Sequence, residues 1–197
     1  MKKLLLSGSL FLMAASIATT SVAVAADTSF YISPCMNPAS GCQAGDADLA
    51  RWALQSWEAA SQGQLHFVES KEEASSLLRF VWEAPSGGLY GETVGINVNG
   101  KRGSVIYIVN TTNGIKDRLL RDTIVYLTCL HESGHALGLQ HTDAFPDIMY
   151  YFGFGGDTNE YFGRYRRKLN AREDIRKNSG LSPADVKHLL ERLTPPV

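Results

Sequence analysis

Five residues within an eleven-residue stretch have the types and the spacing of a zinc site. On a helix, His131 and His135 lie one turn apart, so both imidazoles face the same side and can bind one metal ion. Glu132 would lie near that metal without binding it, which is where a general base is needed. His141 can supply a third ligand if Gly138 adopts a positive φ, ends the helix and lets the chain turn back.

This arrangement predicts metal-assisted hydrolysis. Three neutral imidazoles leave a coordination position open on zinc, and a water bound there becomes acidic near neutral pH. Glu132 would take the proton from that water and pass it to the departing amine. Ser133 is not expected to act as a nucleophile, because the neighbouring imidazoles are committed to the metal.

The stretch HExxHxxGxxH, followed eight residues after its last histidine by Met149, resembles the metzincin clan of zinc metallopeptidases. Within that clan the chain resembles matrixin-type catalytic domains, through Gly134, Leu137 and Leu139. Residues 147–150 resemble the methionine turn of the clan. The resemblance implies that the target is a peptide bond of a protein or peptide substrate and that Met149 forms an apolar floor under the metal.

The resemblance also bears on the metal content. Matrixins bind a structural zinc through further histidines that this chain does not supply, so we predict one catalytic Zn²⁺ and no role for His66 or His188 as ligands. Asp46 and Asp48 could offer oxygen ligands to calcium, but no calcium-loop motif is present. Calcium binding is therefore not predicted.

The residues after Met149 depart from the matrixin pattern. Matrixins usually have a tyrosine and then a proline there, whereas this chain has Tyr150 and Tyr151. Astacin-like and serralysin-like relatives have a tyrosine two positions after the methionine, close to zinc and the oxyanion. This similarity implies that the Tyr151 hydroxyl donates to the tetrahedral intermediate. The alternative is that both tyrosines line the specificity pocket.

The N-terminus predicts export. Lys2 and Lys3 precede an apolar run at residues 4–17, and an Ala-x-Ala pattern follows at residues 23–25. We interpret residues 1–26 as a signal peptide, because the apolar run is too short for a transmembrane segment. The protein should be secreted or periplasmic, and the short signal suits a bacterium. Residues 27–197 suffice for a single catalytic domain, expected to be a monomer.

The three cysteines have different expected roles. Cys35 and Cys42 enclose a turn-rich loop in a protein predicted to be exported, which favours a disulfide. The alternative is that one of them reaches the zinc as a latency thiol, although the switch motif of the family is missing. Cys129 lies in an apolar helical run and is expected to be a buried, unreactive thiol.

Hydrophobic periodicity predicts an α+β fold. Leu49, Ala53 and Trp57 recur at helical spacing, with Asp46 or Asp48 as the N-cap. Strands are expected at residues 65–68, 77–82 and 104–110, the metal-binding helix at 117–139, and a C-terminal helix from residue 182. Together these elements suggest a metzincin-like domain with a mixed twisted sheet, a backing helix, an active-site helix and a final helix.

Two further segments have alternative interpretations. In the resembling family an edge strand near residues 86–96 binds the substrate as an extra strand. The alternative is a mobile loop, because the segment is rich in glycine. The final helix is expected to have Ser182 as its N-cap, Pro183 at its first position and Asp185 near the positive end of its dipole.

Residues 150–180 form an unusually long segment before that final helix, with residues 152–156 expected to be mobile. Residues 164–177 contain seven basic and two acidic residues, a net charge of +5, whereas the rest of the chain after residue 26 carries −8. The basic segment could border the pocket and attract an acidic substrate or an anionic surface, or it could be a solvated helical face. Nucleic-acid binding is not predicted, because no matching motif accompanies these charges.

These observations favour a secreted zinc endopeptidase. Two other functions use the same residues: an exported zinc-binding or partner-recognition protein without proteolysis, and a hydrolase of cell-wall peptides. Glu132 separates the first of these from an enzyme, because zinc binding alone requires no carboxylate at that position.

Overall fold

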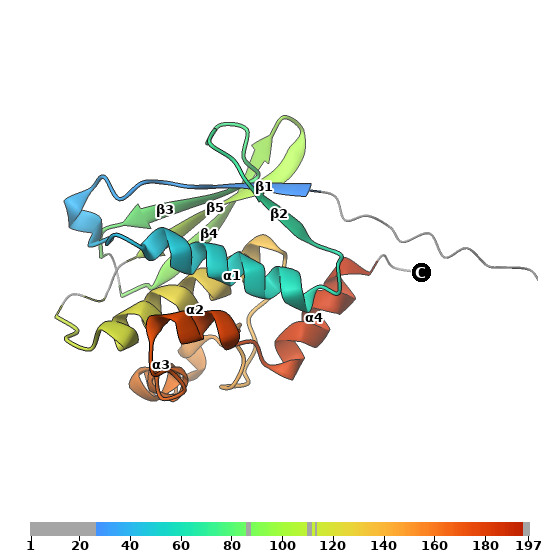
Figure 1. Ribbon diagram of the computed structural model, residues 1–197. Coiled ribbons are helices and arrows are strands. Elements are labelled where there is room, and N and C mark those ends of the chain that lie inside the picture. The colour runs from blue at the N-terminus through green and yellow to red at the C-terminus, as the bar shows by residue number, and fades with distance from the viewer. Residues whose placement is uncertain (1–26, 86–87, 110–111, 113, 195–197) are drawn as a thin grey trace, which may run out of the picture.

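The computed structural model describes residues 27–85, 88–109, 112 and 114–194. The predicted signal peptide, residues 1–26, lies outside this range. A sheet lies across one side of the domain, and helices α1 (Asp46–Ala60) and α2 (Arg118–Ala136) pack beneath it. Helix α3 (Thr158–Arg166) lies farther from the sheet, beyond α2, and α4 (Pro183–Leu193) lies at one end of the domain (Figure 1). The predicted α+β class is confirmed.

The sheet is mixed, as expected, and has the strand order β2-β1-β3-β5-β4. Strands β1 (Asp27–Ile32), β2 (His66–Glu69), β3 (Leu78–Glu83) and β5 (Lys101–Val109) run parallel to one another. Strand β4 (Gly91–Val98) is antiparallel to β5 and lies at the edge. Residues 91–96 are therefore strand, which contradicts the mobile-loop alternative for them. The turn between β4 and β5 places Asn99 and Gly100 at positive φ, the backbone that a tight hairpin requires.

The hydrophobic core lies between the sheet and the first two helices. Phe80 and Ile106 from the sheet are fully buried, as are Leu49 and Trp57 from α1. The Trp57 indole N–H donates to the carbonyl of Leu130 in α2 at 2.9 Å. Trp57 is thus a core residue whose polar atom has a hydrogen-bond partner, and it links α1 to α2.

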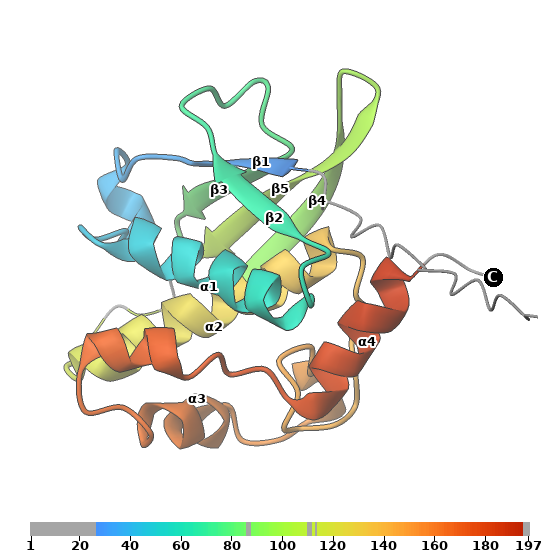
Figure 2. The same cartoon turned by 45° about the vertical axis from the view of Figure 1, so that its right-hand side comes forward.

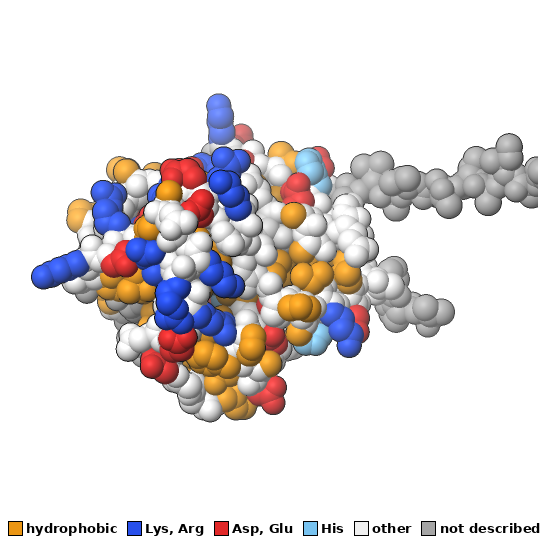
Figure 3. Space-filling model, turned by 60° about the horizontal axis from the view of Figure 1, so that its bottom comes forward, with side chains coloured by type: hydrophobic (Ala, Val, Ile, Leu, Met, Phe, Trp, Pro, Cys, Tyr) orange, Lys and Arg blue, Asp and Glu red, His pale blue; other side chains and the backbone are white. Residues whose placement is uncertain are grey.

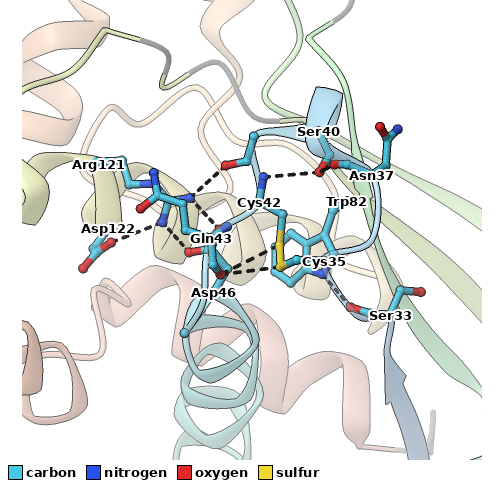
Figure 4. The surroundings of a disulfide bond; sticks show 12 residues. Ser33, Cys35, Asn37, Ser40, Cys42, Gln43, Asp46, Trp82, Arg121 and Asp122 are labelled. Atoms are coloured by element: carbon cyan, nitrogen blue, oxygen red, sulfur yellow. Dashed lines mark hydrogen bonds and ion pairs between the residues drawn. A yellow bond between two sulfur atoms is a disulfide. The ribbon is translucent and has the colours of Figure 1, made fainter.

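The predicted N-cap of α1 is wrong. Gly45, at φ +98°, occupies the cap position and makes no side-chain hydrogen bond there. Asp46 is buried in the first turn, where its carboxylate accepts from the Gln43 N–H at 2.9 Å and pairs with the Arg121 guanidinium of α2. A buried guanidinium requires a charged partner, and that requirement takes precedence over helix capping. Figure 4 shows this pair beside the Cys35–Cys42 loop.

The predicted disulfide between Cys35 and Cys42 is present, with the two Cα atoms 5.4 Å apart. Both sulfur atoms are engaged in it, so the latency-thiol alternative is contradicted. Its loop includes the short helix η1 (Pro38–Ser40). Cys129 is buried as predicted, and burial raises the pKa of its thiol well above the usual value.

Residues 150–180 contain more structure than expected. They include η2 (Phe152–Phe154), helix α3 and η3 (Arg172–Lys177), so the stretch expected to be mobile begins with a helical turn. The buried side chains of Tyr161, Phe162 and Tyr165 attach α3 to the rest of the core. Their spacing is helical, a signal that the strong local charge obscured. No helix among the described residues has both the length and the apolar character needed to cross a membrane.

Candidate metal centre

Helix α2 carries two of the predicted ligands, His131 and His135. The helix begins after Asp117, whose carboxylate accepts backbone N–H bonds from Leu119 and Leu120. It ends as the sequence predicts, because Gly138 lies at φ +91° and donates its N–H to the carbonyl of His135 at 2.9 Å. The reversed chain then brings the third ligand beside the first two.

The three imidazoles form one cluster. Their ring centroids lie 4.8 Å apart for His131 and His135, 5.3 Å for His131 and His141, and 4.6 Å for His135 and His141. One nitrogen from each ring lies within 4.8 Å of the nitrogens from the other two rings. The Nε2 atoms of His135 and His141 are 3.1 Å apart. Tetrahedral zinc with bonds of about 2.0–2.1 Å places its nitrogen ligands roughly 3.4 Å apart. The three nitrogens are therefore close enough together to hold one metal ion.

Backbone carbonyls orient two of the rings. The His131 Nδ1 lies 2.6 Å from the Ile148 carbonyl oxygen, and the His135 Nδ1 lies 3.0 Å from that of Leu139. A carbonyl oxygen can only accept, so each Nδ1 carries the hydrogen and each Nε2 keeps a free lone pair. Burial, supported by the neighbouring imidazoles, lowers the pKa of His131 to about 4. Burial also lowers the pKa of His141. Neutral imidazole is the form that binds a metal.

Met149 lies against helix α2 and is only 1% exposed. It packs on Gly134, where a Cβ atom would overlap the Met149 Sδ and lie 3.1 Å from the Trp57 ring. The Met149 carbonyl accepts from the Thr142 N–H at 2.8 Å, which closes the turn. The glycine thus lets the methionine turn approach α2 closely, and the predicted role of Met149 as a floor under the metal stays a prediction.

The C-terminal helix supports this turn. Ser182 caps α4 as predicted and forms a capping box with Asp185. The buried Asp185 carboxylate also accepts from the Ile148 N–H at 2.8 Å. Because the carbonyl of Ile148 also accepts a hydrogen bond from His131, Ile148 connects Asp185 of α4 to the first predicted ligand, His131. Figure 2 shows α4 beside the loop that follows α2. Burial raises the pKa of Asp185, against the effect of its backbone hydrogen bonds.

The three histidines and Glu132 line a cavity of about 780 Å³. Residues 88–93, in and before the edge strand β4, line one side. Tyr150 and Phe152 line it after the methionine turn, and Tyr161 and Phe162 from α3 add aromatic surface. The long segment after Met149 therefore contributes to the cavity through α3.

The basic part of that segment does not line the cavity. Arg166 pairs with Asp117 at 2.9 Å, and Arg172 pairs with Asp122 at 3.0 Å. Figure 3 shows Lys and Arg side chains interspersed with acidic ones on the face that carries them. Part of the positive charge of residues 164–177 is therefore neutralised by ion pairs within the protein. Contact between this segment and an anionic partner stays a prediction.

Tyr151 lies at the mouth of the cavity. Its ring stacks on His141 with centroids 4.8 Å apart and 24° between the planes, and 48% of the residue is exposed. The neighbouring Tyr150 is buried, and its hydroxyl donates to the Gly155 carbonyl at 2.9 Å. The two tyrosines therefore differ in environment, and the proposed hydrogen bond from Tyr151 to a reaction intermediate stays a prediction.

Glu132 lines the cavity and is only 5% exposed. The Thr93 hydroxyl lies 2.8 Å from its Oε2. Burial raises the pKa of Glu132 to about 7, and the hydrogen bond from Thr93 opposes that rise. Thr93 could not be predicted from the sequence, because 39 residues separate it from Glu132 and no periodicity relates the two positions.

The structure brings together the three histidines and Glu132, the four side chains of the motif that were expected to bind the metal or act as the base. His66 is not part of this cluster; its Nδ1 forms a hydrogen bond with the Asp27 carboxylate at 2.8 Å. Comparison with known protein families and with curated proteins found no match for this chain.

Proposed function

We propose that the chain is a zinc-dependent endopeptidase of the metzincin type, related to matrixins, that hydrolyses peptide bonds outside the cytoplasm. The observation that carries the proposal is the convergence of His131, His135 and His141 beside the buried carboxylate of Glu132, in an open cavity. The predicted signal peptide and the disulfide agree with an oxidising location.

The three histidines would hold zinc through the nitrogens that do not contact carbonyl groups. When bound, zinc supplies Lewis acidity, which acidifies water and polarises the carbonyl of the scissile bond. Glu132 accepts a proton from the attacking water and later gives it to the amine nitrogen that leaves. A base of this kind has no function in zinc storage, so the placement of Glu132 favours an enzyme over the zinc-binding alternative.

The substrate would bind along the edge strand. Strand β4 pairs with β5 and has its other side at the edge of the sheet, so residues 88–93 can offer backbone groups to an extended peptide. Main-chain bonds of this type tolerate many sequences. The aromatic surface of Tyr161 and Phe162 would then accept an apolar side chain next to the scissile bond.

The test is cleavage of an unbiased peptide library by the purified exported protein. We expect cuts that stop when a chelator removes zinc, return when zinc is restored, and are absent from Glu132→Ala with zinc affinity retained. Glu173→Ala, which removes an exposed carboxylate outside the cavity, is the control and should cut normally. A folded, zinc-loaded wild type that cuts no peptide would instead support the binding role or a substrate outside the library, such as a cell-wall peptide.

A further inference from the structure

The edge strand that lines the cavity also contacts the proposed base. Gly91 and Thr93 lie two residues apart in β4, opposite Ile108 and Ile106 of β5, and so face the same side of the sheet. Both are next to Glu132 of α2. We propose that Gly91 and Thr93 are positioning residues that fix the carboxylate of Glu132, an inference that rests on the proposed function.

Thr93 contributes a directed hydrogen bond. Its hydroxyl lies 2.8 Å from the Oε2 of Glu132 and 2.9 Å from the Glu132 backbone oxygen. One hydroxyl hydrogen shared between these two acceptors holds the side chain in a defined relation to its own backbone. Within the described part of the chain, Thr93 is the hydrogen-bond donor to this carboxylate. Its loss would leave a buried carboxylate without that donor.

Gly91 contributes space. A Cβ atom there would lie 2.6 Å from the Glu132 Cγ and 2.8 Å from its Oε1. It would also lie 2.9 Å from the carbonyl oxygen of Tyr107, which belongs to the neighbouring strand and cannot move freely. An alanine at this position must therefore displace the glutamate side chain or separate β4 from α2. Thr93 thus binds one carboxylate oxygen, and the missing Cβ of Gly91 leaves room for the other.

The two contacts couple the base to the strand along which the substrate would bind. A displacement of about 1 Å in a reacting group can cost roughly 100-fold in rate. A peptide that docks on β4 would therefore meet a carboxylate whose position is set by the same strand. Loss of either contact should lower kcat more than it changes KM, because the main-chain groups of β4 remain.

The first experiment measures kcat and KM for zinc-loaded variants on a cleaved peptide. We expect Thr93→Val to lower kcat by about tenfold to a hundredfold, the range that one hydrogen bond to a charged group supports, with KM nearly unchanged. Thr93→Ser should restore most of the rate, because it keeps the hydroxyl. Gly91→Ala should lower kcat about 100-fold. Gly95→Ala is the matched control in the same strand, since a Cβ there meets nothing within 4 Å.

A second measurement uses the metal-free protein. Thr93→Val should lower the urea unfolding midpoint of the wild type more than it lowers that of Glu132→Ala, because Glu132→Ala has already lost the contact between the hydroxyl and the carboxylate. Equal shifts in both backgrounds would overturn the inference, as would a normal kcat in Thr93→Val. If the wild type cuts no peptide, unequal shifts still support the contact while the proposed function fails. Zinc affinity should be unchanged in all of these variants.

Discussion

Removing one partner of the buried ion pair between Asp46 and Arg121 should destabilise the protein far more than removing one partner of the exposed pairs nearby. The Asp46 and Arg121 side chains are 2% and 5% exposed, and they join α1 to α2 beside the disulfide loop. Asp46→Asn keeps the shape and the acceptor for the Gln43 N–H but removes the charge. The variant therefore leaves a guanidinium buried without its main partner.

The expected loss follows from that geometry. Removing one partner of a buried pair costs about 3–5 kcal/mol. Asp122, 3.3 Å from the same guanidinium nitrogen, offers partial compensation, so we expect about 3 kcal/mol. In a domain of this size, that loss lowers Tm by about 6–12 °C. Urea unfolding followed by circular dichroism would measure the free energy, and a thermal scan would measure Tm.

Asp48→Asn is the matched control for this prediction. Asp48 lies in the same helical turn and pairs with Arg51 at 2.9 Å, but its side chain is 47% exposed. An exposed pair of this kind contributes about 0–1 kcal/mol. If Asp46→Asn destabilises the protein no more than Asp48→Asn, the reasoning from burial is refuted.

Three further predictions concern the disulfide, the methionine turn and Tyr151. Replacing Cys35 and Cys42 by serine removes a disulfide between residues 7 positions apart, and should lower the free energy of unfolding in urea by about 2.5 kcal/mol with zinc affinity unchanged. An unaltered unfolding midpoint would refute this prediction. Gly134→Ala should lower stability by about 1–3 kcal/mol because its Cβ overlaps Met149, and a variant as stable as the wild type would contradict that contact. Tyr151→Phe should lower kcat about 100-fold if the hydroxyl stabilises the intermediate, whereas undiminished turnover with unchanged substrate affinity would dispose of that role.

Local signals predicted the cluster of His131, His135 and His141. The spacing of His131 and His135 depends only on the helical repeat, and the position of Gly138 depends only on its tolerance of positive φ. Ser182 likewise caps α4 through contacts within one turn. Each of these features involves residues a few positions apart, so the amino-acid types suffice to predict them.

The errors have a common physical origin in contacts between distant parts of the chain. Asp46 looked like a helix cap because its partner, Arg121, is 75 residues away. Strand β1 and helix α3 went unpredicted, since their burial depends on neighbours that the sheet and α2 supply. A short apolar segment carries little information about which surface it will cover.

The motif alone therefore determined which side chains could bind zinc and act as the base, because helical periodicity and glycine geometry are properties of nearby residues. The folded chain decided how the Glu132 carboxylate is held. Thr93 reaches Glu132 only because β4 lies at the sheet edge above α2, and Asp185 reaches the methionine turn only because α4 packs beside it. Such contacts arise from packing whole elements together, and no local sequence pattern encodes them.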